Sequence, residues 1–269
     1  VAGGDAHRRG IARRVILRRV VDVAYVHPGG HSAEILSRLD SRGRLLAFDR
    51  DADALERRIP DSRLTLIHNN FRFVHNYALL EARRAARDFR ECAVDGILAD
   101  LGVSSHQFDT AERGFSFRFD APLDMRMNTA ASLSAADVVN GYDEERLERI
   151  LRLYGEVDAS RRIASLVVAA RSKAEIRTTG ELNEAIRDAL PPFAEHKSLS
   201  KIYQALRIEV NGEMRSLEKF LEGAVMSLRE GGRLVVITYH SLEDRMVKNF
   251  IKAGNVAGEV HKDAFGRKM

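Results

Sequence analysis

The chain has 269 residues, of which 45% are hydrophobic and 30% are charged, which indicates a globular protein and excludes a disordered one. Its one cysteine, Cys92, excludes an internal disulfide and a cysteine-based zinc site, and is expected to serve packing. No apolar run approaches the roughly 20 residues that span a bilayer, and no segment resembles a signal peptide. We therefore expect a cytoplasmic protein with no membrane partner and no metal centre.

The net charge of +4 comes almost wholly from the start of the chain. Residues 1–20 contain six arginines and one acidic residue. The positive charge of this segment therefore exceeds the net charge of the whole protein. A basic protein commonly binds nucleic acid. Here the surplus belongs to one short arm, so composition alone is weak evidence for such a partner.

Strand and helix patterns alternate along most of the chain. β-branched, apolar composition between turn residues predicts strands at 20–26, 44–48, 64–68, 94–99 and 233–239. Helical patterns lie at 33–39, 52–58, 77–89, about 202–228 and 242–251. Glu230-Gly231-Gly232 is expected to stop the long helix, and Ser241 to cap the last one with Asp244 as its capping-box acid. This alternation predicts an α/β fold with a mostly parallel, doubly wound sheet.

The alternation stops after the fourth strand. Only helices are predicted between residues 133 and 190, at 134–139, 144–154, 159–172 and 179–189. Thr178-Thr179-Gly180-Glu181 is typical of a helix start, and Pro191-Pro192 of a stop. The simplest architecture is a Rossmann-like domain with an inserted helical module.

The first candidate site is the turn between the first strand and its helix. Gly29, Gly30 and His31 lie there, where a glycine turn lets a ligand approach the backbone and a helix N-terminus attracts negative charge. An ordinary tight turn would have the same sequence. Asp49 ends the second strand, where Rossmann-type domains bind ribose hydroxyls, while Asp51 is expected to cap the next helix.

Two further strand ends carry candidate residues. Phe71 follows the third strand and could line an adenine pocket or belong to the core. Asp100 ends the fourth strand, and the small and polar residues after it, up to Gln107, suit the polar end of a ligand better than a helix-capping loop. After the fifth strand, His240 and Ser241 suggest a hydrolase, but Gly-x-Ser-x-Gly is absent; Glu243 and Arg245 fit a structural or substrate-positioning role.

Five ordered motifs carry a resemblance to a known family. They are Asp100-Leu101-Gly102-Val103-Ser104-Ser105, Glu112-Arg113-Gly114-Phe115-Ser116, Leu123-Asp124-Met125-Arg126-Met127, Tyr203-Gln204-Ala205-Leu206-Arg207-Ile208 with Val210-Asn211, and His240-Ser241-Leu242-Glu243-Asp244-Arg245. With them the chain resembles the RsmH (MraW) family from about residue 21 to 258. The resemblance implies a class I methyltransferase that uses S-adenosylmethionine. Its implied substrate is the exocyclic N4 of a cytosine in the decoding region of small-subunit (16S) ribosomal RNA.

The resemblance also implies particular residues and boundaries. The cofactor contacts fall on Gly29, Gly30, His31, Asp49, Phe71, Asp100 and Gln107, and Asp100 is the candidate catalytic residue. Residues 1–103 and 199–269 correspond to the discontinuous methyltransferase domain, and 104–198 to the inserted substrate-recognition domain. The implied partner is 16S ribosomal RNA within the small subunit, and a homodimer stays open. Arg113, Arg118 and Arg126 near the site, and Arg161 and Arg162 on the insert, are candidate RNA contacts. All five could instead be solvated or ion-paired surface residues, which fits Arg161 and Arg162 better.

The first loop departs from the family pattern. It is one residue longer, and Pro28 removes one N–H donor. We hypothesise that residues 1–28 partly reflect a shifted reading frame and that the C-terminus is truncated. A catalytically impaired, RNA-binding remnant is therefore one alternative function. A dinucleotide-dependent oxidoreductase is a second alternative, although the sequence lacks Gly-x-Gly-x-x-Gly.

Overall fold

A computed structural model describes residues 19–23, 30–56, 59–84 and 94–260. The chain divides into two compact units, which we call the sheet unit (Val1–Gly102 and Met214–Met269) and the helical unit (Val103–Glu213). Gly29, Cys92 and the predicted end of the first strand lie outside the described residues. None of the helices within the described ranges is long and apolar enough to span a membrane.

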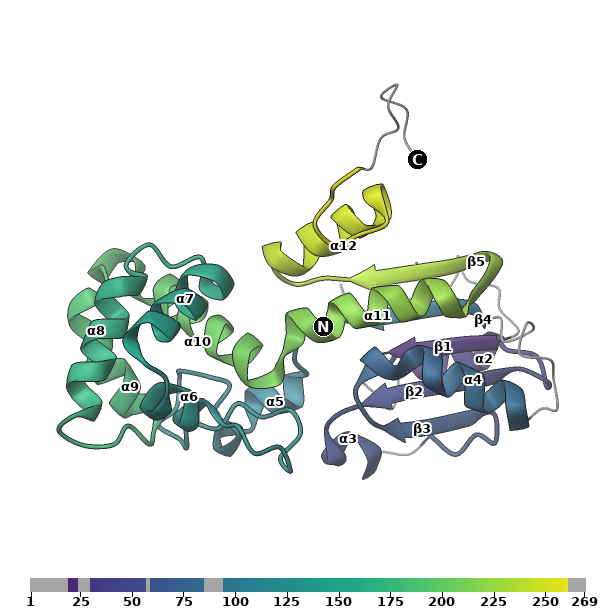
Figure 1. The fold of residues 1–269 in the computed structure, drawn as a ribbon. Helices are drawn as coiled ribbons and strands as arrows, with labels where there is room; N and C mark the ends of the chain where they lie inside the picture. The colour runs from purple at the N-terminus through teal and green to yellow at the C-terminus, as the bar shows by residue number, and fades with distance from the viewer. Residues whose placement is uncertain (1–18, 24–29, 57–58, 85–93, 261–269) are drawn as a thin grey trace, which may run out of the picture. The chain divides into compact units, whose positions relative to one another are not determined.

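The sheet unit contains a five-stranded sheet in which all neighbouring strands run parallel (Figure 1). The strands are β1 (Arg19–Val23), β2 (Arg44–Asp49), β3 (Leu64–His68), β4 (Val94–Asp100) and β5 (Leu228–Ile237). Their order is β3-β2-β1-β4-β5, so the sheet grows from β1 in both directions. The predicted α/β fold with a parallel sheet is confirmed.

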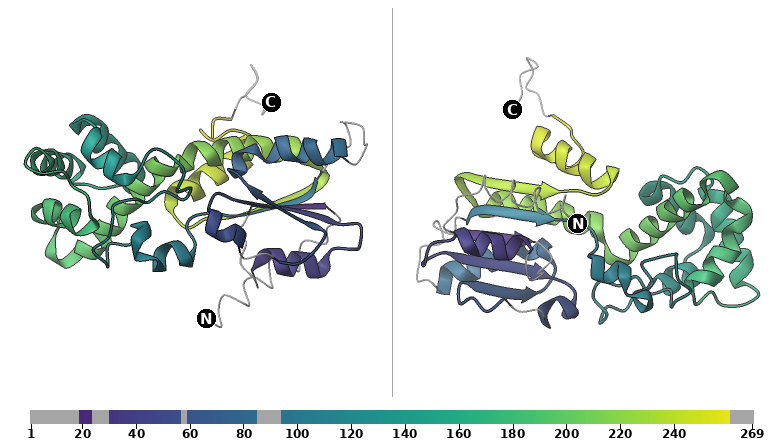
Figure 2. Two further views of the ribbon diagram at one scale, coloured as in Figure 1. Left: turned by 90° about the horizontal axis from the view of Figure 1, so that it is seen from below. Right: turned by 180° about the vertical axis from the view of Figure 1, so that it is seen from behind.

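Helices cover both faces of this sheet, as the left view of Figure 2 shows. The helices of the unit are α2 (His31–Arg38), α3 (Ala52–Glu56), α4 (Val74–Arg84), α11 (Glu213–Ser227) and α12 (Ser241–Ala253). Ile97 and Ala99 of β4 share one hydrophobic core with α4, α11 and α12. Leu98, between them, packs with α2 in a second core. The sheet is therefore doubly wound, because a period of two sends neighbouring side chains to opposite faces.

The helical unit packs its helices around a core of its own. Its helices are α5 (Ser105–Asp109), α6 (Ala135–Gly141), α7 (Glu144–Gly155), α8 (Ser160–Arg171), α9 (Thr179–Ile186) and α10 (Glu195–Asn211). Thr178 caps α9 through a capping box with Glu181, as the sequence predicts. The boundary expected at residue 198 falls inside α10, which belongs wholly to the helical unit.

The single helix predicted over residues 202–228 is wrong. The chain forms two helices, α10 and α11, because Gly212 adopts a left-handed conformation (φ 56°) that ends α10. The predicted glycine stop at Glu230-Gly231-Gly232 is also wrong, since α11 ends at Ser227 and β5 begins at once with Leu228. Gly231 (φ 71°) lies in an irregularity of the β4–β5 pairing, where register shifts between Val94 and Gly96.

Candidate active site

Polar residues meet at the carboxyl ends of the parallel strands. Asp100 is the last residue of β4, and β4 and β2 lie on either side of β1. In an open α/β sheet, ligands bind beside the strand ends where the order reverses. Asp100 therefore lies at the switch point of this sheet, as the sequence suggested.

Both carboxylate oxygens of Asp100 have a partner from another part of the sheet unit. Oδ2 lies 3.2 Å from Nε2 of His31, and Oδ1 accepts a hydrogen bond of 2.8 Å from the hydroxyl of Tyr239. The Asp100 side chain keeps 21% of its surface exposed, whereas that of His31 keeps 8%. The carboxylate is thus held in one orientation while part of it still faces solvent.

His31 reaches Asp100 from the first turn of α2. It is the first residue of this helix, and Gly30 before it is the N-cap. A glycine has no side chain with which to cap, and no side-chain cap is present on α2. The first backbone N–H groups of α2 are therefore left without a side-chain cap, at the end of the helix that carries a partial positive charge.

Asp49 ends β2, as predicted, and its carboxylate is already partly engaged. Oδ1 of Asp49 accepts a hydrogen bond of 2.8 Å from the backbone N–H of Asp51. Asp51 in turn accepts a hydrogen bond from the backbone N–H of Asp53 and so caps α3. The capping role predicted for Asp51 is confirmed. A carboxylate has further lone pairs with which Asp49 could accept from sugar hydroxyls.

Phe71 follows β3 and packs into the core that covers one face of the sheet. Its ring makes an edge-to-face contact with Phe220 of α11, with 5.3 Å between the ring centroids. Asn70 supports the same turn, because its side chain accepts from the N–H of Arg72 and donates to Ser216. The side chain of Phe71 is only partly buried, so one part of it serves the core and another faces outward.

Gln107 has a capping role within the helical unit. The side chain of Ser104 accepts from the N–H of Gln107, and Oε1 of Gln107 accepts from the N–H of Ser104 at 3.1 Å. This reciprocal pair is a capping box at the start of α5, and Gln107 is buried in it. The structure therefore brings Gly30, His31, Asp49, Phe71 and Asp100 into the sheet unit, while Gln107 belongs to the helical unit.

Tyr239 is a residue of this site that the sequence analysis missed. Besides its hydrogen bond to Asp100, its ring lies against Gly102, where a Cβ atom would be 3.3 Å from Cδ2 of the tyrosine. Gly102 also has φ +90°, a conformation that other residues rarely adopt. Its position in the sequence could have indicated this role, because Tyr239 follows β5, the strand that pairs with β4.

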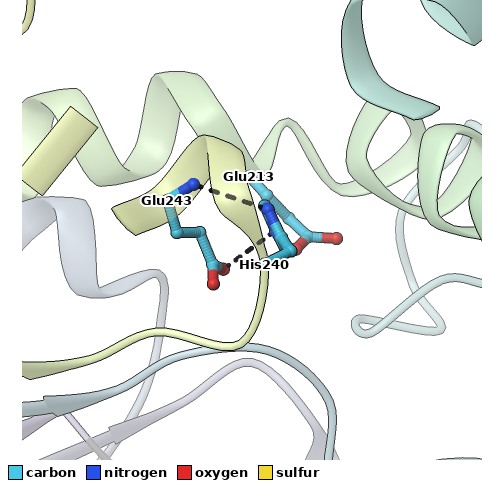
Figure 3. A group of neighbouring side chains, drawn as sticks. All are labelled: Glu213, His240 and Glu243. Carbon is cyan, nitrogen blue, oxygen red and sulfur yellow. Dashed lines mark hydrogen bonds and ion pairs between the residues drawn. The ribbon is translucent and has the colours of Figure 1, made fainter. Parts of the chain in front are cut away.

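The start of α12 differs from the expected capping arrangement. His240, and not Ser241, is the N-cap: its Nδ1 accepts from the N–H of Glu243 at 3.4 Å, and its Nε2 lies 3.2 Å from Oε1 of Glu243 (Figure 3). Asp244 forms an ion pair with Lys248 instead of closing a capping box. Glu213, also drawn in Figure 3, pairs with Arg207 of α10 at 2.9 Å.

Two of the three arginines expected to contact RNA have structural roles. Arg113 is buried and donates from Nη2 to the carbonyl oxygens of Arg126 and Met127, at 2.9 and 3.1 Å. Arg126 pairs with Asp124 at 2.6 Å, which raises the pKa of the Arg126 guanidinium. The guanidinium of Arg113 is thus used inside the fold, which does not favour an RNA contact. Arg126 is ion-paired but keeps 26% of its side chain exposed, so an RNA contact by Arg126 stays a prediction. Arg118, Arg161 and Arg162 are exposed.

Comparisons with known proteins identify the family of this chain. A family model described as the MraW methylase family matches residues 19–263. The chain is 52% identical over 263 residues to Ribosomal RNA small subunit methyltransferase H of Bacteroides fragilis, which covers 94% of this chain and 84% of that protein. Proteins of the same name are 51% identical in Flavobacterium psychrophilum (92% and 82% covered) and 46% identical in Christiangramia forsetii (94% and 84% covered). The resemblance drawn from the motifs is confirmed, and the chain belongs to the MraW methylase family.

Proposed function

We propose that this protein transfers a methyl group from S-adenosylmethionine to the exocyclic N4 of a cytosine in the decoding region of small-subunit (16S) ribosomal RNA. The observation that carries the proposal is the Asp100 carboxylate, held at both oxygens at the switch point of the sheet. Membership of a methylase family supports the reaction class and speaks against an oxidoreductase. The printed name of the relatives supports the RNA substrate.

In this proposal the sheet unit is a class I, Rossmann-like methyltransferase domain, and the helical unit is an inserted substrate-recognition domain. The support is the order of the elements. The helical unit occupies the chain between β4 and the helix that leads to β5, and the sheet reverses its winding beside β4. A ligand bound at that switch point would lie at the strand end from which the helical unit departs.

The residues at the strand ends fit the chemistry of the cofactor. The N-terminus of α2, with Gly29, Gly30 and His31, would receive the carboxylate of the methionine part, because no side chain caps this helix. Asp49 would accept from the ribose hydroxyls and Phe71 would line the adenine pocket. Asp100 would complete the set within the sheet unit. When bound, S-adenosylmethionine supplies an electrophilic methyl group on a sulfonium.

Asp100 would act on the amine that receives the methyl group. A neutral exocyclic amine attacks in line, so the protein has to hold that nitrogen in position and accept a proton. A carboxylate accepts hydrogen bonds and cannot donate them when ionised, so it orients the amine by an N–H bond and leaves the nitrogen lone pair toward the methyl group. His31 and Tyr239 already hold the two oxygens of Asp100 in place. Little conformational entropy of the Asp100 side chain is therefore lost when it binds the amine.

The test compares two aspartates on the same strand. Asp100→Asn keeps the size of the side chain and removes its charge, and we expect methyl transfer at saturating cofactor to fall by about a hundredfold or more. Asp95→Asn is the matched control, because Asp95 lies at the other end of β4, where it pairs with Arg229 at 2.6 Å. The rate of methyl transfer by Asp95→Asn should stay within about threefold of that of the wild type. The measurement uses labelled S-adenosylmethionine with small ribosomal subunits, followed by nucleoside analysis of the RNA.

Three outcomes would contradict the proposal. Label found on another atom or base would overturn the N4-cytosine assignment. Equal activity in Asp100→Asn and the wild type would overturn the role of Asp100. If calorimetry shows no binding at millimolar S-adenosylmethionine, the protein is the catalytically silent, RNA-binding remnant.

A further inference from the structure

Tyr239 is an exposed aromatic side chain that is nevertheless fixed at several points. It keeps 67% of its surface exposed. Its hydroxyl donates to Oδ1 of Asp100 at 2.8 Å, and its backbone N–H donates to Oε2 of Glu243 at 3.0 Å. Among the described residues of the sheet unit, it is the one exposed aromatic side chain, while Phe48, Phe71, Tyr77 and Phe220 make ring contacts with one another in pairs.

Burial of apolar surface does not account for the position of this ring. A side chain that leaves two thirds of its surface in water gains little from the hydrophobic effect. What holds it is polar and local. Glu243 is buried, with 3% exposure, and is itself held by His240, so it anchors the backbone of Tyr239 at the start of α12. The hydroxyl then ties the far end of the ring to Asp100.

Gly102 makes room for the ring beside the strand end. A Cβ atom at this position would lie 3.3 Å from Cδ2, 3.9 Å from Cγ and 4.0 Å from Cε2 of Tyr239. Residue 102 follows β4 by two positions, so the ring rests on the loop that begins at Asp100. A larger residue would press on the ring, and the positive φ of Gly102 disfavours one in any case.

We propose that the ring of Tyr239 is the surface on which the target cytosine stacks, with its exocyclic amine at Asp100. This inference rests on the proposed function and names the residue that holds the base. Enzymes that modify a base take it out of its stack, and proteins hold such bases on aromatic side chains and read their polar edges. A ring bonded to Asp100 through its hydroxyl places any base stacked on it beside that carboxylate. An aromatic side chain also has few rotatable bonds, so little entropy is lost when the base binds.

The test separates the ring of Tyr239 from its hydroxyl. Tyr239→Phe keeps the stacking surface and removes the bond to Asp100, whereas Tyr239→Leu removes both. Stacking of a base on an aromatic side chain contributes about 1–3 kcal/mol. We therefore expect Tyr239→Phe, which loses its hydrogen bond to Asp100, to lower kcat by about tenfold. Tyr239→Leu should lower kcat/KM for the small subunit by about a further tenfold to a hundredfold. The Kd for S-adenosylmethionine, measured by calorimetry, should be the same in the two variants, because both lose the bond to Asp100.

The outcomes distinguish this inference from the function on which it rests. If Tyr239→Phe loses as much activity as Tyr239→Leu, the ring adds nothing beyond its hydroxyl and the stacking role is wrong. If Tyr239→Leu equals the wild type, the ring does not contact the base. Either result leaves RNA methylation by the wild type intact. A wild type that does not methylate the small subunit would overturn the proposed function, and this inference with it.

Discussion

Nε2 of His31 lies 3.2 Å from Oδ2 of Asp100, which joins the first turn of α2 to the end of β4. Both side chains belong to the sheet unit, and His31 is 7% exposed. The contact places a nitrogen that can donate next to a carboxylate that accepts. The glycine turn and the strand end, which the sequence analysis treated as separate signals, are thus parts of one site.

The first prediction concerns the donor that His31 offers to Asp100. The glutamine in His31→Gln has an amide N–H that can still donate to Asp100. The leucine in His31→Leu has no donor. A hydrogen bond to a charged group contributes about 1.5–3 kcal/mol, so we expect His31→Leu to lower kcat by about tenfold to a hundredfold. His31→Gln should recover a large part of that loss. Single-turnover methyl transfer at saturating cofactor provides the measurement, and equal losses in the two variants would show that His31 acts in some other way.

The second prediction uses three glycines of the helical unit. Gly114 has φ +68°, and a Cβ atom there would clash with the carbonyl oxygen of Pro122 and lie 2.8 Å from the backbone nitrogen of Asp124. Gly212 has φ +56° with open space around it, and Gly141 has open space and no positive φ. Gly114→Ala should therefore lower the free energy of unfolding by several kcal/mol, and Gly212→Ala should lower it by about 1 kcal/mol. Gly141→Ala should leave it unchanged or raise it by up to about 1 kcal/mol.

Denaturant unfolding of the three alanine variants tests that order. The comparison separates steric overlap from backbone strain, because Gly212 has the strain without the overlap. If Gly212→Ala were as destabilised as Gly114→Ala, backbone strain alone would explain the cost at both positions.

The third prediction concerns Asn211, a buried side chain that joins two distant segments. Its Oδ1 accepts from the N–H of Met127 at 2.8 Å, and its Nδ2 donates to the carbonyl oxygen of Met125 at 2.8 Å. Met125 has φ 59°, so these bonds stabilise a backbone conformation that is unfavourable for a methionine. Asn211→Ala leaves buried backbone groups without their partners, and we expect a loss of about 3 kcal/mol.

Asn128→Ala provides the matched control for Asn211. Its side chain accepts one exposed hydrogen bond of 3.0 Å, from the N–H of Ala130. Its loss should cost less than about 1 kcal/mol in the same unfolding measurement. A similar cost for the two variants would argue against the joining role of Asn211.

The fourth prediction is a pH dependence from Tyr142. Burial, and then the hydrogen bond of 2.7 Å to Glu209, raise the pKa of the Tyr142 hydroxyl from 10.0 to about 12. The unfolded chain loses this proton near pH 10 and the folded protein near pH 12, so the unfolded state binds fewer protons between these values. The contribution of Tyr142 to stability is therefore complete below pH 10 and is lost as the pH rises to 12.

Tyr142→Phe removes the ionisable group and provides the comparison. It should lose about 1–3 kcal/mol near neutral pH with the hydrogen bond to Glu209, but its unfolding free energy should fall less steeply between pH 10 and 12 than that of the wild type. Tyr203, whose pKa is also raised by burial, is present in both proteins and cancels in the difference. Parallel pH profiles for the two proteins would contradict the raised pKa.

Local patterns were enough to predict most elements of the fold. The predicted strand at 64–68 coincides with β3, and the predicted helix at 144–154 starts where α7 does. Apolar periodicity and capping residues act over a few positions, so they can be recognised along the chain. The predictions failed where a backbone conformation was decisive, as at Gly212, or where a cap depended on orientation, as at His240.

Asp100, Asp49 and the glycine turn could be recognised from the sequence because parallel strands bring their carboxyl ends to one edge of a sheet. The partners of Asp100 could not, since Tyr239 lies 139 residues away and reaches it only through the pairing of β4 with β5. The buried role of Arg113 was equally invisible, because a charged side chain turns inward only where folding supplies acceptors. Sequence patterns thus specify the elements and the chemistry at their ends, whereas packing between distant segments specifies which groups hold the site together.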